Sequence, residues 1–117
     1  MPLVQFSLPL MLTLATEEGL CSMERIVEVM CHNPAQLFHI EKRGFIRPGY
    51  KADLVLVKNK EWKIQREDVL SKCRWSPLEG ETMKWAVAKT WVNGQCVYDK
   101  DKGVEPNVYG KPLKFNA

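Results

Sequence analysis

The chain has no long hydrophobic run and no strong excess of one charge. Its longest apolar stretch, Leu8-Pro9-Leu10-Met11-Leu12, is interrupted by proline and is far shorter than the roughly 20 residues of a membrane-spanning helix. No basic residue precedes this stretch, as a secretory signal would require. The net charge is only +3, and acidic and basic residues interleave, whereas phosphate recognition needs clustered positive charge. These absences argue against membrane, secreted and nucleic-acid-binding proteins, and we expect a cytoplasmic location.

Patterns that bind metals or carry redox chemistry are also scarce. No Cys-x-x-Cys pair occurs, and the spacing predicts reduced, mostly buried thiols. The four cysteines are Cys21, Cys31, Cys73 and Cys96. There are two histidines, His32 and His39, with Pro34 between them and no His-x-His pair. What is present, 117 residues of which 45% are hydrophobic, suits one small globular domain.

The first third of the chain has helical periodicity. Apolar residues from Leu8 to Glu18 form one broad stripe, and Gly19 stands where a helix C-cap belongs. Ser22 is a good N-cap for a second helix, along which apolar residues again repeat at helical spacing. Asn33-Pro34-Ala35-Gln36 predicts the start of a third helix, with an Asn cap, proline at the first helical position and a capping-box Gln.

The pattern changes to that of β-structure after Arg43. Two glycines and a proline between Gly44 and Gly49 predict a turn, and Ala52 to Val57 is a run of β-formers that is apolar on both faces. Such a strand is predicted to be central in its sheet. A short strand is predicted at Trp62 to Gln65, an irregular loop at Ser71 to Glu81 and a further strand from Met83 to Thr90.

The strongest local signal is Asn93-Gly94, flanked by alternating β-formers from Thr90 to Tyr98. Both residues accept the positive φ angles of a type I′ turn, so a tight hairpin is predicted there. Beyond Tyr98 the chain is charged and rich in Gly, Pro and Asn, which predicts a tail that lies on the surface or frays.

Three of these segments together resemble the closing part of a metal-dependent cyclic amidohydrolase. The pattern Gly44-x-Ile46-x-x-Gly49-x-x-Ala52-Asp53-Leu54-Val55 is shared across amidohydrolases, including allantoinase, hydantoinase and urease-like enzymes. Lys72-Cys73-Arg74-Trp75-Ser76-Pro77-Leu78-Glu79-Gly80, together with Thr90-Trp91-Val92-Asn93-Gly94, is similar to the bacterial dihydroorotase family. The resemblance extends from Pro2 to about Tyr98.

The resemblance implies an α+β fold in three parts. Residues 1–43 would be terminal helices of a (β/α)8 barrel, residues 44–98 the C-terminal part of a small composite β-sandwich, and residues 99–117 a surface tail. A complete barrel takes roughly 250 residues. The chain is therefore expected to be the C-terminal piece of an enzyme, beginning just after the last contribution to the active site.

The implied reaction is the reversible hydrolysis of dihydroorotate to N-carbamoyl-aspartate in pyrimidine biosynthesis by a metal-activated hydroxide. The family uses a His-x-His pair, a modified lysine, two further histidines and an aspartate as ligands to a divalent metal, here expected to be zinc in the parent enzyme. None of these motifs occurs in this chain. No catalytic, cofactor-binding or metal-ligating residue can be assigned, and the chain alone is predicted to be inactive.

Several residues that could carry chemistry also have plain structural interpretations. Cys31-His32 resembles a metal corner but falls at a helix end, and Asp53 is expected to anchor the preceding glycine turn through backbone hydrogen bonds. The remaining candidates lack a spacing that would unite them, and are interpreted as solvated loop residues or as core. These are Asp68, Glu79, Glu81, Trp62, Trp75, Trp85 and Trp91.

Helices and strands without their usual neighbours would leave apolar faces and open edges. We therefore expect self-association, and association with the remainder of the parent chain. Two alternatives stay open. One is a self-contained interaction module with this fold, and the other is the corresponding piece of an allantoinase or hydantoinase.

Overall fold

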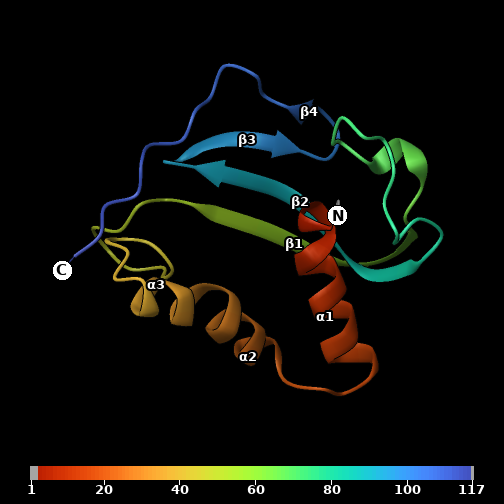
Figure 1. Cartoon of the computed structure of the whole chain (residues 1–117), viewed down its shortest axis with the longest axis horizontal. Coiled ribbons are helices and arrows are strands. Elements are labelled where there is room, and N and C mark those ends of the chain that lie inside the picture. The colour runs from red at the N-terminus through yellow and green to blue at the C-terminus, as the bar shows by residue number, and fades with distance from the viewer. Residues whose placement is uncertain (1–2, 117) are drawn as a thin grey trace. The chain divides into compact units, whose positions relative to one another are not determined.

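The computed structural model describes residues 3–116; Met1, Pro2 and Ala117, at the ends of the predicted first and last parts, lie outside the described residues. Figure 1 shows the elements in chain order. They are η1 (Val4–Phe6), α1 (Ser7–Glu17), α2 (Met23–Val27), η2 (Glu28–His32), α3 (Asn33–Leu37), β1 (Leu54–Lys63), η3 (Arg66–Asp68), β2 (Thr82–Val92), β3 (Gln95–Asp99) and β4 (Gly103–Val104). This is an α+β structure, as predicted. Within residues 3–116, no helix is both long and apolar enough to cross a membrane.

The chain divides into two units. One consists of the segment that ends at Met23 together with Lys58–Ala86, and the other of Glu24–Val57 together with Val87–Ala117. The strands β1 and β2 contribute residues to both units. The division of the chain into parts at residues 43 and 98 stays a prediction.

Helix α1 confirms the first predicted helix. It ends at Glu17, and Gly19 adopts a φ of +64°, which a glycine beyond a helix end tolerates at low cost. Pro9 lies in the first turn, where a missing N–H does no harm. The hydroxyl of the buried Thr13 donates to the Pro9 carbonyl at 2.7 Å and accepts the Lys84 N–H at 3.0 Å. This one hydroxyl therefore ties α1 to the beginning of β2.

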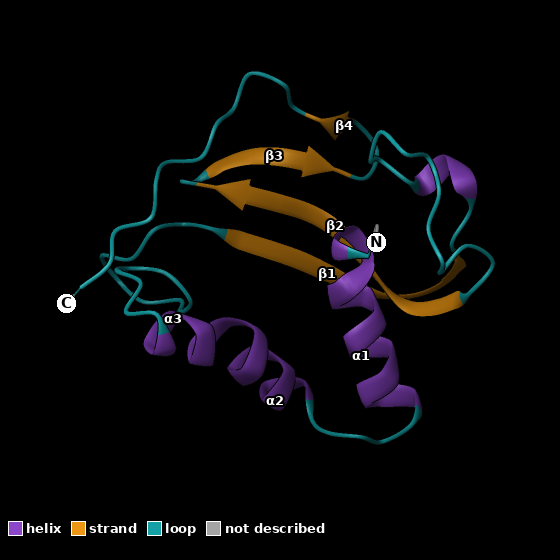
Figure 2. Cartoon of the chain, viewed as in Figure 1, coloured by secondary structure: helices purple, strands orange, loops and turns teal. Residues whose placement is uncertain are grey.

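The predicted break before the third helix is wrong. In Figure 2 the helical ribbon continues from α2 into α3, and the residues between them, η2, form a π-helix. The N–H of Asn33 bonds to the Glu28 carbonyl, five residues back, and no Asn33 side-chain cap is present because the position before α3 is His32. Pro34 cannot donate to the helical ladder, and the wider π turn accommodates it without ending the helix.

The four strands form one sheet in the order β1-β2-β3-β4, which corrects two predictions. The separate strands expected at 52–57 and 62–65 are one strand, β1, and β1 lies at an edge of the sheet rather than at its centre. A two-sided apolar pattern shows that a strand needs cover, but it does not say how many neighbours pair with its backbone. Val55 and Leu56 are accordingly 46% and 44% exposed.

The Asn-Gly hairpin is confirmed. Val92 pairs with Gln95 in antiparallel register, and Asn93 and Gly94 between them have φ angles of +50° and +79°. The register shifts between Thr90 and Trp91, which marks a bulge in β2.

The C-terminal segment lies on the surface, as predicted, but it is more ordered than a fraying tail. β4 pairs with β3 in antiparallel register, as Figure 1 shows, and farther along the chain Phe115 forms a bridge with Ile40. The Asn116 N–H also bonds to the His39 carbonyl at 2.8 Å. Backbone pairing therefore holds this polar segment in place without burying it.

The core of the first unit is small and apolar. Its fully buried members are Phe6, Ile64, Val69 and Met83, against which Leu10, Trp62 and Leu78 pack. The tryptophans predicted as core are only half-buried at Trp62, Trp85 and Trp91, and Trp75 is 49% exposed. The Trp62 indole donates to the Trp85 carbonyl at 2.7 Å, so it serves the edge of the core with a satisfied polar group.

Candidate functional site

The glycine-rich loop that carries the amidohydrolase-like pattern is folded tightly against a helix. Gly44 has a φ of +85°, and a Cβ at this position would lie 2.7 Å from the Cys31 carbonyl oxygen and would also overlap Ala35. The loop is closed at its base because the Lys51 N–H bonds to the Lys42 carbonyl at 2.8 Å. Gly44 is therefore required both by its backbone conformation and by the lack of space beside it.

Asp53 joins this loop to the Asn-Gly hairpin. One carboxylate oxygen accepts the Arg43 Nε–H at 2.7 Å, and the other accepts the Asn93 N–H at 2.8 Å. The Gly94 N–H adds a bond to the Ala52 carbonyl at 3.0 Å. Asp53 thus has the predicted anchoring role with different partners: an arginine side chain and the hairpin backbone, rather than the backbone of the glycine turn.

The contacts of Asp53 set the sign of its pH dependence. Partial burial by itself raises the pKa of this carboxyl, but the Asn93 N–H and the Arg43 guanidinium outweigh it and lower the pKa below its ordinary value of 3.8. A pKa that is lower in the folded state stabilises the protein above the ordinary value, and this stabilisation is lost as the pH falls through the folded-state pKa.

Replacing Asp53 by asparagine should therefore destabilise the protein in a pH-dependent way. We expect Asp53→Asn to lower the free energy of unfolding by about 1–2 kcal/mol near neutral pH, because the charge-assisted bond to Arg43 is lost. The difference from the unsubstituted chain should shrink toward zero as the pH falls below the ordinary pKa of the carboxyl. Urea denaturation across this pH range measures it, with the exposed Asp101→Asn as control. A difference that did not change with pH would contradict the ion-pair explanation.

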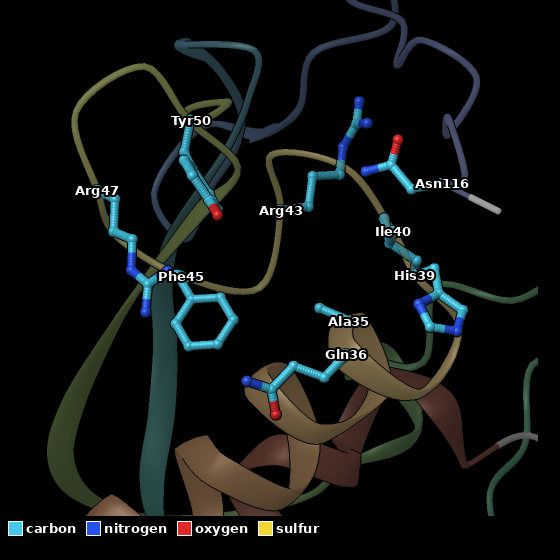
Figure 3. A pocket seen from close by; sticks show the side chains of 9 residues that line it. All are labelled: Ala35, Gln36, His39, Ile40, Arg43, Phe45, Arg47, Tyr50 and Asn116. Carbon is cyan, nitrogen blue, oxygen red and sulfur yellow. The ribbon is translucent and has the colours of Figure 1, made fainter.

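A hollow of about 340 Å³ lies beside the loop and is shown in Figure 3. Its lining residues are Ala35, Gln36, His39, Ile40, Arg43, Phe45, Arg47, Tyr50 and Asn116. Phe45 stacks on His32 with ring centroids 4.2 Å apart, and the Arg47 guanidinium lies 4.0 Å from the Phe45 centroid. In Figure 3 the guanidinium groups of Arg43 and Arg47 point in different directions. The hollow therefore offers no converging set of catalytic groups.

The residues of the chain do not fit a metal centre. His32 is committed to its stack with Phe45, while His39 lies at the rim of the hollow. Across residues 3–116, no group of three or more His, Cys, Asp or Glu side chains is placed to hold an ion. The cysteines are free, as predicted, but Cys31, Cys73 and Cys96 are exposed and Cys21 is half-buried, so the prediction of mostly buried thiols is wrong.

The dihydroorotase-like segment, Lys72 to Gly80, is a chain of turns. It is held at its end by Ile64, whose carbonyl accepts the Gly80 N–H at 2.8 Å and whose N–H bonds to the Glu81 carbonyl at 3.0 Å. Ser76 is buried, and its hydroxyl accepts the Leu78 N–H at 3.2 Å. The segment contributes local order rather than an acid-base pair.

The acidic candidates do not converge either. Glu79 and Glu81 are exposed, as expected of solvated loop residues. The Asp68 carboxylate accepts the Gln65 N–H at 2.8 Å and so caps η3. Sequence reasoning missed the Arg43–Asp53 pair and the His32–Phe45–Arg47 stack, for which the only signal was the presence of charged and aromatic residues around the glycine loop.

Comparison with known proteins identifies the class. The Amidohydrolase family profile matches residues 7–98, and the chain belongs to this family. A dihydroorotase from Pyrococcus furiosus is 35% identical over 96% of the chain, which covers 26% of that protein. An allantoinase from Bacillus velezensis is 29% identical over 94% of the chain and 24% of its own length. The chain thus spans about a quarter of the length of these relatives.

Structural comparison agrees with the family. The L-hydantoinase (dihydropyrimidinase) from Arthrobacter aurescens superposes with a TM-score of 0.77 and 35% sequence identity, over 85% of this chain and 22% of that one. The chain is therefore related to dihydroorotases, hydantoinases and allantoinases, all of which are cyclic amidohydrolases by name.

Proposed function

We propose that this chain is the C-terminal segment of a dihydroorotase, whose whole enzyme reversibly hydrolyses dihydroorotate to N-carbamoyl-aspartate. The observation that carries the proposal is the 35% identity to a dihydroorotase over 96% of the chain, which covers only 26% of that relative. The Lys72 to Gly80 segment, which resembles dihydroorotases, favours this enzyme within the family.

The division of labour follows from the donor atoms that the chain has. Hydrolysis of a ring amide by a metal-activated hydroxide requires several ligands that converge on the ion. Residues 3–116 contain no such group, and the two histidines have other surroundings. In this proposal the divalent metal, zinc, and the catalytic residues belong to the remainder of the enzyme. The present segment supplies terminal barrel helices and part of a β-sandwich, and alone it is inactive.

A second candidate is the corresponding segment of a hydantoinase or allantoinase. The TM-score of 0.77 and 35% identity to the L-hydantoinase support this alternative. Both candidates place the chemistry outside this chain and differ in the ring that is opened. They can therefore be separated only in a protein that contains a complete active site.

Segment exchange tests the proposal. The matching quarter of the Pyrococcus furiosus dihydroorotase is replaced by this chain, and the same exchange is made in the L-hydantoinase. Each hybrid is assayed on dihydroorotate, hydantoin and allantoin, with circular dichroism to verify folding. We expect no turnover by the 117-residue chain alone and a larger retained activity in the dihydroorotase hybrid.

The outcomes discriminate as follows. Greater retention in the L-hydantoinase hybrid would favour the second candidate. Turnover by the purified chain alone would overturn both. Folded hybrids without activity in either host would indicate that the segment does not serve such an enzyme, and would favour an interaction module.

A further inference from the structure

We propose that two copies of this chain associate through the open edge of β1, with the two β1 strands antiparallel and centred on Leu56. β1 is the first strand in the sheet order, and within residues 3–116 no strand lies on its other side. An edge strand presents unpaired N–H and C=O groups, which are a template for another strand. Val55 and Leu56, 46% and 44% exposed, point to opposite faces, so a paired strand would cover apolar surface on both.

Charges restrict where this edge can pair. The first four residues of β1, Leu54 to Val57, are uncharged, whereas Lys58, Lys60, Glu61 and Lys63 follow in the same strand. Lysines on an edge oppose indiscriminate pairing. An attractive register must therefore align the apolar half of each strand and place the charged half opposite residues of the other sign.

A second copy meets these conditions in one register. Because alternate residues direct their N–H and C=O groups to the open edge, a two-fold antiparallel pairing aligns residues of the same parity. Centred on Leu56, it aligns Leu56 with its own copy and Val55 with Val57 on the other strand. The same register aligns Lys51 with Glu61, a pair of opposite charges that occurs twice because of the symmetry.

The two neighbouring two-fold registers are worse. Centred on Val55, the pairing sets the Asp53 carboxylate opposite Val57; centred on Val57, it sets Asp53 opposite Glu61 and Lys51 opposite Lys63. Like charges directly opposite each other destabilise a strand pair. Glu61 also pairs with Lys84 in its own chain, but its side chain remains 64% exposed and can meet a second cation.

Sedimentation velocity of the full 117-residue chain from about 1 to 100 µM tests for a reversible dimer, a range in which exposed apolar edges associate. Leu56→Lys places two ammonium groups opposite each other and should weaken the dimer by at least about tenfold. Ile46→Lys, at a loop residue that is 88% exposed, is the matched control and should leave dimerisation unchanged. A monomeric chain, or a dimer that persists in folded Leu56→Lys, would overturn the proposal.

A charge exchange tests the register. Lys51→Glu and Glu61→Lys should each weaken the dimer by about fivefold, because each creates two like-charged pairs. The double variant restores opposite charges and should bind more tightly than either single variant. Losses that simply accumulate in the double variant would rule out the Lys51–Glu61 alignment, and with it the register centred on Leu56.

Discussion

Replacing Gly44 by alanine is expected to lower the free energy of unfolding by about 3–5 kcal/mol, a large part of the stability of a small domain. The residue has a φ of +85°, a conformation that is strained for alanine. The added methyl group would also overlap Ala35 and lie 2.7 Å from the Cys31 carbonyl oxygen, so helix and loop would have to separate. Urea denaturation followed by circular dichroism measures the loss.

Gly49 provides the control in the same loop. Its φ is +83°, nearly that of Gly44, but a Cβ there would meet nothing within 4 Å. Gly49→Ala should therefore cost only the conformational part, about 1 kcal/mol. Equal losses at the two positions would mean that the close approach of the loop to the helix contributes nothing to stability.

The parts of the fold that were predictable depend on residues next to each other in the chain. Asn93-Gly94 accepts positive φ angles and so specifies its own turn, and Gly19 ends α1 for the same reason. Motifs such as the glycine loop before Asp53 likewise identified the family, which the match over residues 7–98 confirms.

The failures concern partners that are distant in sequence. Apolar alternation in Leu54 to Val57 could not reveal that β1 continues to Lys63 or lies at an edge, because sheet position depends on which strands are available to pair. Pro34 was taken to begin a helix, but a π turn lets it continue one. The Arg43–Asp53 bond joins residues ten apart around a loop, and no periodicity predicts it.

Edge exposure and partial length are related features of this chain. A segment that spans about a quarter of its relatives has the turns and helix ends that its own residues specify. It also has a strand with two apolar faces and an unpaired edge, among residues 3–116. If the remainder of the proposed enzyme occupies that edge, it should compete with the dimer, so adding it should dissociate the β1 pair.

Replacing Ile64 by alanine is expected to cost about 3 kcal/mol of unfolding free energy. Ile64 is 1% exposed and belongs to the buried cluster with Phe6, Val69 and Met83, so truncation leaves a cavity in the core of its unit. Its backbone bonds to Gly80 and Glu81 also hold the end of the dihydroorotase-like segment. Chemical denaturation measures the loss, and hydrogen exchange at the Gly80 N–H should quicken.

Two further variants separate cavity formation from loss of β propensity. Ile46→Ala makes the same chemical change at a side chain that is 88% exposed, and it should alter the unfolding free energy by no more than about 0.5 kcal/mol. Ile64→Val keeps the branched carbon and should cost only about 1 kcal/mol. If Ile64→Val were as damaging as Ile64→Ala, the loss would not scale with the volume removed. A cavity in this core would then not be its cause.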